Sequence, residues 1–198
     1  MHFDEAERGF SLRLNGPLDM RFDTRNGKTA ADILNYSDEK EIYEILKNYG
    51  EEPQSRKIAS EIIKQRKIQK FETTKDLIDF LDTKIHTHIK IKMRVFQALR
   101  IEVNQELETL QKSLEQAVKL LKTNGKICVI SFHSLEDRIV KHFFQQESRD
   151  CICSDLICSC KHKKSLKILT KKPILPSPEE QKINSRSRSA KARCAIKI

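Results

Sequence analysis

The residues best suited to chemistry stand close together, between positions 131 and 138 of this 198-residue chain. A histidine, a serine, two carboxylic acids and an arginine lie here: His133, Ser134, Glu136, Asp137 and Arg138. This mixture exceeds what a simple connection requires, and we treat the segment as a candidate site. A plainer alternative is that Ser134 and Asp137 form a helix-capping box and that Arg138 is a surface cation.

The flanking sequence predicts the elements that position this segment. Apolar residues recur every three or four positions over 96–121, which predicts one long helix ended by Asn124 and Gly125. The unbroken apolar run at 127–130 predicts a strand buried on both faces of a parallel sheet. A second amphipathic helix follows from Ser134. Helix, strand, turn and helix form the repeating unit of a doubly wound α/β fold, in which ligands collect beyond the carboxyl ends of the strands.

Other segments complete the prediction. Residues 28–85 show no strand-like alternation, and their capping signals predict a compact all-helical module. Thr29 with Asp32 and Thr73 with Asp76 read as capping boxes, and Ser37 as a further helix cap. Residues 166–175 and 190–198 could add strands to the sheet.

Positive charge is concentrated at the carboxyl end of the chain. From residue 161 to residue 198 there are twelve basic residues and two acidic ones, whereas the rest carries 26 of each. A polyanion-binding surface would produce this distribution, and so would a solubilising tail. No stretch is apolar and long enough to span a membrane, and the acidic opening residues do not resemble a secretory signal. We therefore expect a cytoplasmic protein.

Four of the six cysteines are crowded together. In a cytoplasmic protein we expect the cysteines to be mostly reduced rather than a disulfide framework. Together with His162, the four could hold a tetrahedral zinc ion, although one-residue spacing within each pair is less favourable than two. They are Cys151, Cys153, Cys158 and Cys160. A competing hypothesis is therefore a zinc-stabilised RNA-binding module without enzymatic activity.

Four ordered blocks of the chain resemble one family. The segment from Phe132 to Lys141 resembles the signature of the ribosomal RNA small subunit methyltransferase H family. Three further blocks are similar to that family in the same order: residues 7–21 with Asp19 and Arg21, residues 96–104, and residues 184–192. Within the signature, the matching polar residues are His133, Ser134, Glu136, Asp137 and Arg138.

The resemblance implies an architecture and a reaction. The fold would be α/β, a partial Rossmann-like class I methyltransferase sheet with an inserted all-helical subdomain. Residues 1–27 would be a loop from the methyltransferase domain, 28–85 the insertion, and 86–198 the carboxyl half of that domain with a basic tail. The implied reaction is the attack of a cytosine N4 amine of small-subunit (16S-type) ribosomal RNA on the methyl group of S-adenosyl-L-methionine. The implied partner is that RNA or the 30S-type subunit.

The chain also departs from the family pattern. The segment before Met93 lacks the usual His-Pro pair. The Gly-rich loop, the ribose-binding acid and the Asp-Leu-Gly-Val-Ser turn are all absent, so we expect this chain to correspond to the carboxyl two-thirds of the enzyme and to be inactive alone. A split gene, a decayed gene and a mis-assigned start codon are all consistent with this absence.

The resemblance and the chemistry nominate individual residues. His2 aligns with a family position beside the cofactor, and His133 and Ser134 are the catalytic candidates. Fork-shaped donors and hydroxyls in the closing segment suit phosphate groups. The candidate RNA contacts are therefore Arg186, Arg188, Lys191 and Arg193.

Overall fold

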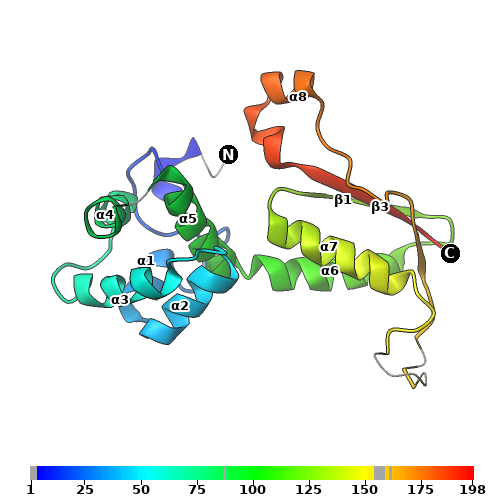
Figure 1. Cartoon of the computed structure of the whole chain (residues 1–198), viewed down its shortest axis with the longest axis horizontal. Helices are drawn as coiled ribbons and strands as arrows, with labels where there is room; N and C mark the ends of the chain where they lie inside the picture. Colours follow the sequence, from blue (N-terminus) through cyan, green and yellow to red (C-terminus); the bar gives the residue numbers. More distant parts are fainter. Residues whose placement is uncertain (1–3, 87, 154–158, 161) are drawn as a thin grey trace. The chain divides into compact units, whose positions relative to one another are not determined.

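The computed structural model describes residues 4–86, 88–153, 159–160 and 162–198 (Figure 1). The chain divides into two compact units, Met1–Glu106 and Leu107–Ile198. We call them the helical unit and the sheet unit. None of the described helices is long and apolar enough to cross a membrane.

The helical unit is built from short helices whose starts are locally encoded. Thr29 with Asp32 and Thr73 with Asp76 form reciprocal capping boxes, as predicted. The cap predicted at Ser37 is wrong, because Asp38 caps the second helix and Ser37 ends the first. The elements are η2 (Ala6–Arg8), α1 (Ala30–Tyr36), α2 (Glu39–Asn48), α3 (Ser55–Gln65), α4 (Thr74–Phe80), the π-helical η3 (Leu81–Ile85) and α5 (Ile89–Asn104).

The loop before α1 is part of this unit's core. Leu18 and Met20 are fully buried in one cluster with apolar residues of α1 to α5. Gly9 lets the loop close on itself, since a Cβ there would lie 2.3 Å from the carbonyl oxygen of Pro17. Its φ of +72° also favours glycine.

The predicted long helix is broken at Gln105, which adopts a left-handed φ of 48°. The Asn104 side chain donates to the carbonyl oxygens of Arg100 and Met20 and accepts from the Phe22 N–H. The apolar residues of 96–121 also belong to two separate cores. Phe96 and Leu99 lie in the cluster of the helical unit, and Leu114 lies in that of the sheet unit. The single-helix prediction was therefore wrong.

The sheet unit contains α6 (Glu106–Leu120), β1 (Lys126–Ser131), α7 (Ser134–Glu147), β2 (Leu166–Ile168), α8 (Pro178–Ile183), η4 (Ser185–Ser189) and β3 (Lys191–Lys197). The three strands lie in the order β1-β3-β2, and both pairings are antiparallel. The predicted α/β class and the strands at 127–130 and 190–198 are confirmed, whereas of 166–175 only Leu166–Ile168 forms a strand and Ile174 makes an isolated bridge to Ala192. The parallel pairing is wrong for these strands.

Within the described part of the sheet unit, helices cover one face of the sheet, and we call the other the open face. Buried residues of β2 and β3 pack with apolar side chains of α6 and α7: Leu166, Ala195, Leu114, Val118, Val140 and Phe144. Along β1, exposed and half-buried residues alternate, and Ile130 remains 61% exposed. The prediction that this strand is buried on both faces is therefore wrong for the described chain, because an edge strand with one covered face alternates in burial.

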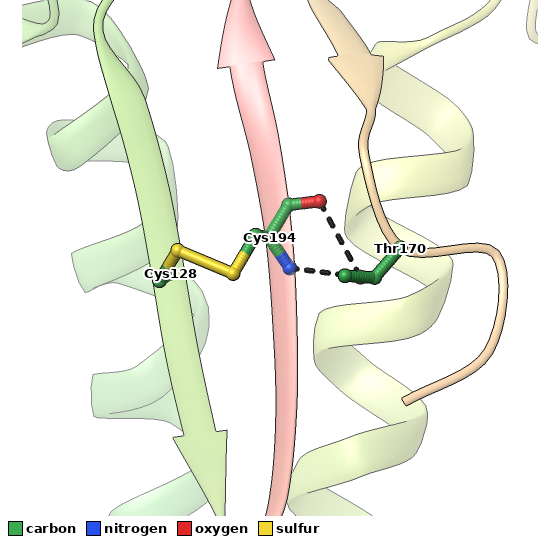
Figure 2. Close-up of a disulfide and its surroundings, with 3 residues drawn as sticks. All are labelled: Cys128, Thr170 and Cys194. Atoms are coloured by element: carbon green, nitrogen blue, oxygen red, sulfur yellow. Dashed lines mark hydrogen bonds between the residues drawn. A yellow bond between two sulfur atoms is a disulfide. The ribbon is translucent and has the colours of Figure 1, made fainter. Parts of the chain in front are cut away.

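A disulfide joins β1 to β3 on the open face. Cys128 and Cys194 are register partners with Cα atoms 4.2 Å apart. The backbone N–H of Cys194 faces away from β1 and donates to the hydroxyl oxygen of Thr170 (Figure 2). Directly opposed residues of this kind approach closely in antiparallel sheets. The expectation of reduced cysteines thus fails for this pair.

Candidate functional site

The carboxyl end of β1 meets the start of β3. Ser131 is the register partner of Lys191, and its hydroxyl donates to the Lys191 carbonyl oxygen at 3.2 Å. The turn after β1, the start of α7 and the η4 segment therefore gather at one end of the sheet. Figure 1 shows α8 beyond this same end. We call this region the β1 end.

His133 organises the start of α7. Its Nδ1 accepts from the Glu136 N–H at 3.4 Å, while the Glu136 carboxylate accepts from the backbone N–H groups of Phe132 and His133. The capping box is thus His133 with Glu136, and the predicted pairing of Ser134 with Asp137 is wrong. Ser134 is the first residue of the helix. The two catalytic candidates therefore both lie at the helix start, where His133 has a structural role.

Asp137 and Arg193 form an ion pair with two hydrogen bonds at the β1 end. The Arg193 Nε and Nη2 atoms donate to the two carboxylate oxygens at 2.6 and 3.1 Å, and Lys191 Nζ lies 3.6 Å from Oδ2. The side chains of Arg193 and Asp137 are only 9% and 13% exposed. Hydrogen bonding to Arg193 lowers the pKa of Asp137 and keeps this carboxylate ionised. The Arg193 side chain, predicted as an RNA contact, is therefore paired with Asp137 within the sheet unit.

The other predicted RNA contacts are more accessible. Arg186 and Arg188 are exposed on η4, and Lys191 is half-buried. The Asn184 side chain caps η4 by accepting from the Arg186 N–H, and the buried Ser187 donates its hydroxyl to the Asn184 carbonyl oxygen at 2.7 Å. The turn is thus fixed from within while its arginines face outward.

Sequence reasoning missed the residues that position this surface. Asn184 and Ser187 hold η4 through hydrogen bonds between their side chains and nearby backbone groups. The signal available in the sequence was the asparagine itself, because its side chain can accept from the backbone N–H two residues later. Phe132 is 54% exposed beside the start of α7, a placement that the sequence pattern did not indicate. Arg138 is exposed on the same helix.

Asp19 and Arg21 lie in the helical unit. The Arg21 guanidinium donates to both Asp19 oxygens at 2.9 and 2.8 Å, and this hydrogen bonding lowers the pKa of Asp19. Arg8 donates to the carbonyl oxygens of Arg21 and Phe22. This pair holds the loop before α1 in shape.

The remaining predictions fall partly outside the described residues. His2 and Cys158 lie there, so the structure does not place the predicted cofactor contact or the full set of four cysteines. Cys151, Cys153 and Cys160 are described and lie together.

Four of the five glycines lie against the chain's own backbone. A Cβ on Gly9, Gly16, Gly50 or Gly125 would lie within 2.8 Å of a carbonyl oxygen of this chain. These glycines serve internal close packing, and only Gly27 faces open space. The glycines of this chain therefore do not form a cradle for S-adenosylmethionine.

A helical unit, an α/β sheet unit and a cationic sheet end define a basic α/β protein. The sequence pattern of the MraW methylase family matches residues 1–198. The chain belongs to this family. It is 49% identical over 203 residues to ribosomal RNA small subunit methyltransferase H of Caldicellulosiruptor saccharolyticus, covering 100% of this chain and 66% of the relative.

Further relatives carry the same name. The protein of Clostridioides difficile is 46% identical over 202 residues, and that of Carboxydothermus hydrogenoformans is 47% identical over 201 residues. Each alignment covers 98% of this chain and 65% of the relative. The chain thus spans a little under two-thirds of the length of these curated relatives.

Proposed function

We propose that this chain is part of an S-adenosyl-L-methionine-dependent methyltransferase that modifies N4 of a specific cytosine in small-subunit (16S-type) ribosomal RNA. The observation that carries the proposal is the family match over the whole chain, together with relatives named for small-subunit ribosomal RNA methylation. The same match favours this function over a non-enzymatic RNA-binding module. Its site of action would be the cytoplasm, on the RNA or a 30S-type subunit.

The sheet is proposed to be the carboxyl portion of a larger Rossmann-like sheet. Among the described strands β1 pairs only with β3, so its other edge is available for a further strand. The exposed Ile130 lies on the open face near that edge. An apolar edge strand of this kind is normally covered in a complete protein. The segment of the relatives that this chain does not span would supply the additional strands.

Residues 28–85 are proposed to form an insertion that helps to define the RNA substrate. They supply α1 to α4 and η3, which pack with α5 in the helical unit. Residues 1–27 and 86–198 would then belong to the methyltransferase domain. Deletion of 28–85 from a complete enzyme should reduce its affinity for RNA, and an unchanged affinity would remove this role.

The proposed contribution of the sheet unit is binding of the RNA backbone. Arg186 and Arg188 present guanidinium groups on a turn fixed by Asn184 and Ser187. Guanidinium groups bind phosphate oxygens in a two-point geometry. Lys191 lies at the same end of the sheet but forms an ion pair with Asp137, which partly neutralises its charge. We place the main phosphate contacts at Arg186 and Arg188.

The cofactor is proposed to bind mainly to the part of the enzyme that this chain does not span. The packing roles of four of the five glycines support this division. The experiment is titration calorimetry with S-adenosyl-L-methionine. The isolated chain should bind negligibly, and its fusion to the additional segment of a relative should restore binding. Micromolar binding by the isolated chain would show that the cofactor site has been misplaced.

A further inference from the structure

The loop between α7 and β2 brings three cysteine sulfurs together. The Sγ atoms of Cys151, Cys153 and Cys160 all lie within 4.8 Å of one another. Those of Cys151 and Cys160 are 3.9 Å apart. The disulfide of the sheet involves none of the three. Three thiols therefore converge at a point that the β1 end does not use.

Ordinary packing does not explain this cluster. Cysteines that act as small apolar residues are usually buried. Here all three are half-buried, and no described residue between 149 and 165 is buried. The described part of this loop thus has no apolar core of its own.

Contacts at the base of the loop hold its two arms together: the outgoing arm leaves α7 and the returning arm leads to β2. The Ser165 N–H donates to the Glu147 carbonyl oxygen at 2.8 Å, and Lys164 forms an ion pair with Asp150 at 3.3 Å. His162 Nε2 lies 3.2 Å from the Gln146 carbonyl oxygen. These contacts bring Cys160 on the returning arm toward Cys151 and Cys153 on the outgoing arm.

Backbone donors point at two of the sulfurs. The Cys153 N–H donates to Cys151 Sγ, and the Ser159 N–H donates to Cys153 Sγ, both at 3.4 Å. Hydrogen bonds of this kind orient ligand atoms from outside the coordination shell. A tetrahedral Zn²⁺ ion with Zn–S bonds of about 2.3 Å separates its sulfur ligands by about 3.8 Å. The observed distance between Cys151 and Cys160 is close to this value.

We propose that Cys151, Cys153 and Cys160 bind one zinc ion through their thiolates. Soft sulfur ligands select zinc over calcium or magnesium. The ion cross-links the two arms of the loop and fixes the connection between α7 and β2. The proposal assigns three ligands and leaves the fourth coordination position unassigned. It does not depend on the methyltransferase proposal, because it concerns the stability of this loop alone.

The experiment measures zinc on the full 198-residue chain, purified without a histidine tag, incubated with zinc and then desalted. Elemental analysis should find one zinc ion per chain. The Cys153→Ser and Cys160→Ser variants should each bind zinc at least about 100-fold more weakly in a chelator competition. The Cys128→Ser/Cys194→Ser double variant is the matched control, and it should keep one zinc ion.

A second measurement distinguishes the loss of zinc binding from misfolding of a variant. Tryptic cleavage after Lys163 and Lys164 should slow on addition of zinc in the unmodified chain and stay unchanged in the Cys153→Ser and Cys160→Ser variants. Circular dichroism should show equal helix content in all forms. A chain without zinc, or single variants that retain it at full affinity, would overturn the proposal.

Discussion

The Asp137 carboxylate and the Arg193 guanidinium are joined by two hydrogen bonds that tie the first turn of α7 to β3. The two residues are 56 positions apart, and both side chains are largely withdrawn from solvent. Because the Arg193 side chain is only 9% exposed and two of its nitrogen atoms donate to Asp137, we assign it to the stability of the sheet unit.

Replacing Arg193 with Ala should destabilise the protein. Removing Arg193 leaves the largely buried Asp137 carboxylate with only the longer Lys191 contact, which costs about 3 kcal/mol of unfolding free energy. Urea denaturation measures the change. The control is Arg25→Ala, whose exposed pair with Asp23 should contribute nothing measurable. Equal effects of the two substitutions would contradict this assignment.

Asp137 should also make stability depend on pH. Hydrogen bonds from Arg193 lower the pKa of Asp137 in the folded protein below its unfolded value of about 3.9. The contribution is therefore fully present above that unfolded value and is lost as pH falls through the lower folded pKa. Between pH 7 and pH 3, Asp137→Asn should lose less unfolding free energy than the unmodified protein. Parallel pH profiles would exclude this linkage.

Arg186 and Arg188 should contribute to RNA affinity through counterion release. Replacing both with Ala should lower the slope of log affinity against log salt by about 1.5 units for RNAs of any sequence. Filter binding over a salt series measures the slope. Lys119→Ala/Lys122→Ala removes two exposed charges near the other end of β1 and should leave the slope nearly unchanged. An equal loss of slope in both variants would mean that the electrostatic attraction to RNA is spread over the surface of the protein.

The disulfide should stabilise the sheet unit. It closes a loop with a sequence separation of 66, for which chain-entropy arguments give about 4 kcal/mol. Reduction should lower the unfolding free energy by about 2 to 4 kcal/mol without removing β1–β3 pairing. Because the Cys128→Ser/Cys194→Ser variant has no disulfide, its stability should not respond to reductant. An unmodified protein that is equally indifferent to reductant would show that these cysteines are thiols in solution.

Local signals could be predicted well from the sequence. The capping boxes at Thr29 and Thr73 depend on residues three positions apart, and the sequence contains all of that information. The box at His133 was missed because an imidazole nitrogen replaces the usual hydroxyl as acceptor. The strand at 127–130 was found from its composition, but composition does not distinguish parallel from antiparallel pairing.

Long-range contacts could not be predicted in the same way. The helix break at Gln105 follows no glycine or proline, and Asn104 is held there by the backbone of Met20 and Phe22. Likewise, Arg193 looked like a phosphate ligand because its buried partner is remote in sequence. The location of the candidate site therefore stays a prediction, and the division between structural and accessible cations required the fold.

This chain is proposed to be part of a small-subunit ribosomal RNA methyltransferase. The most direct measurement is transfer of a labelled methyl group from S-adenosyl-L-methionine to unmethylated small-subunit RNA, followed by nucleoside analysis. The chain fused to the additional segment of a relative should produce N4-methylcytidine, and the chain alone should produce none. A fused enzyme that binds both cofactor and RNA yet forms no N4-methylcytidine would contradict the proposed function.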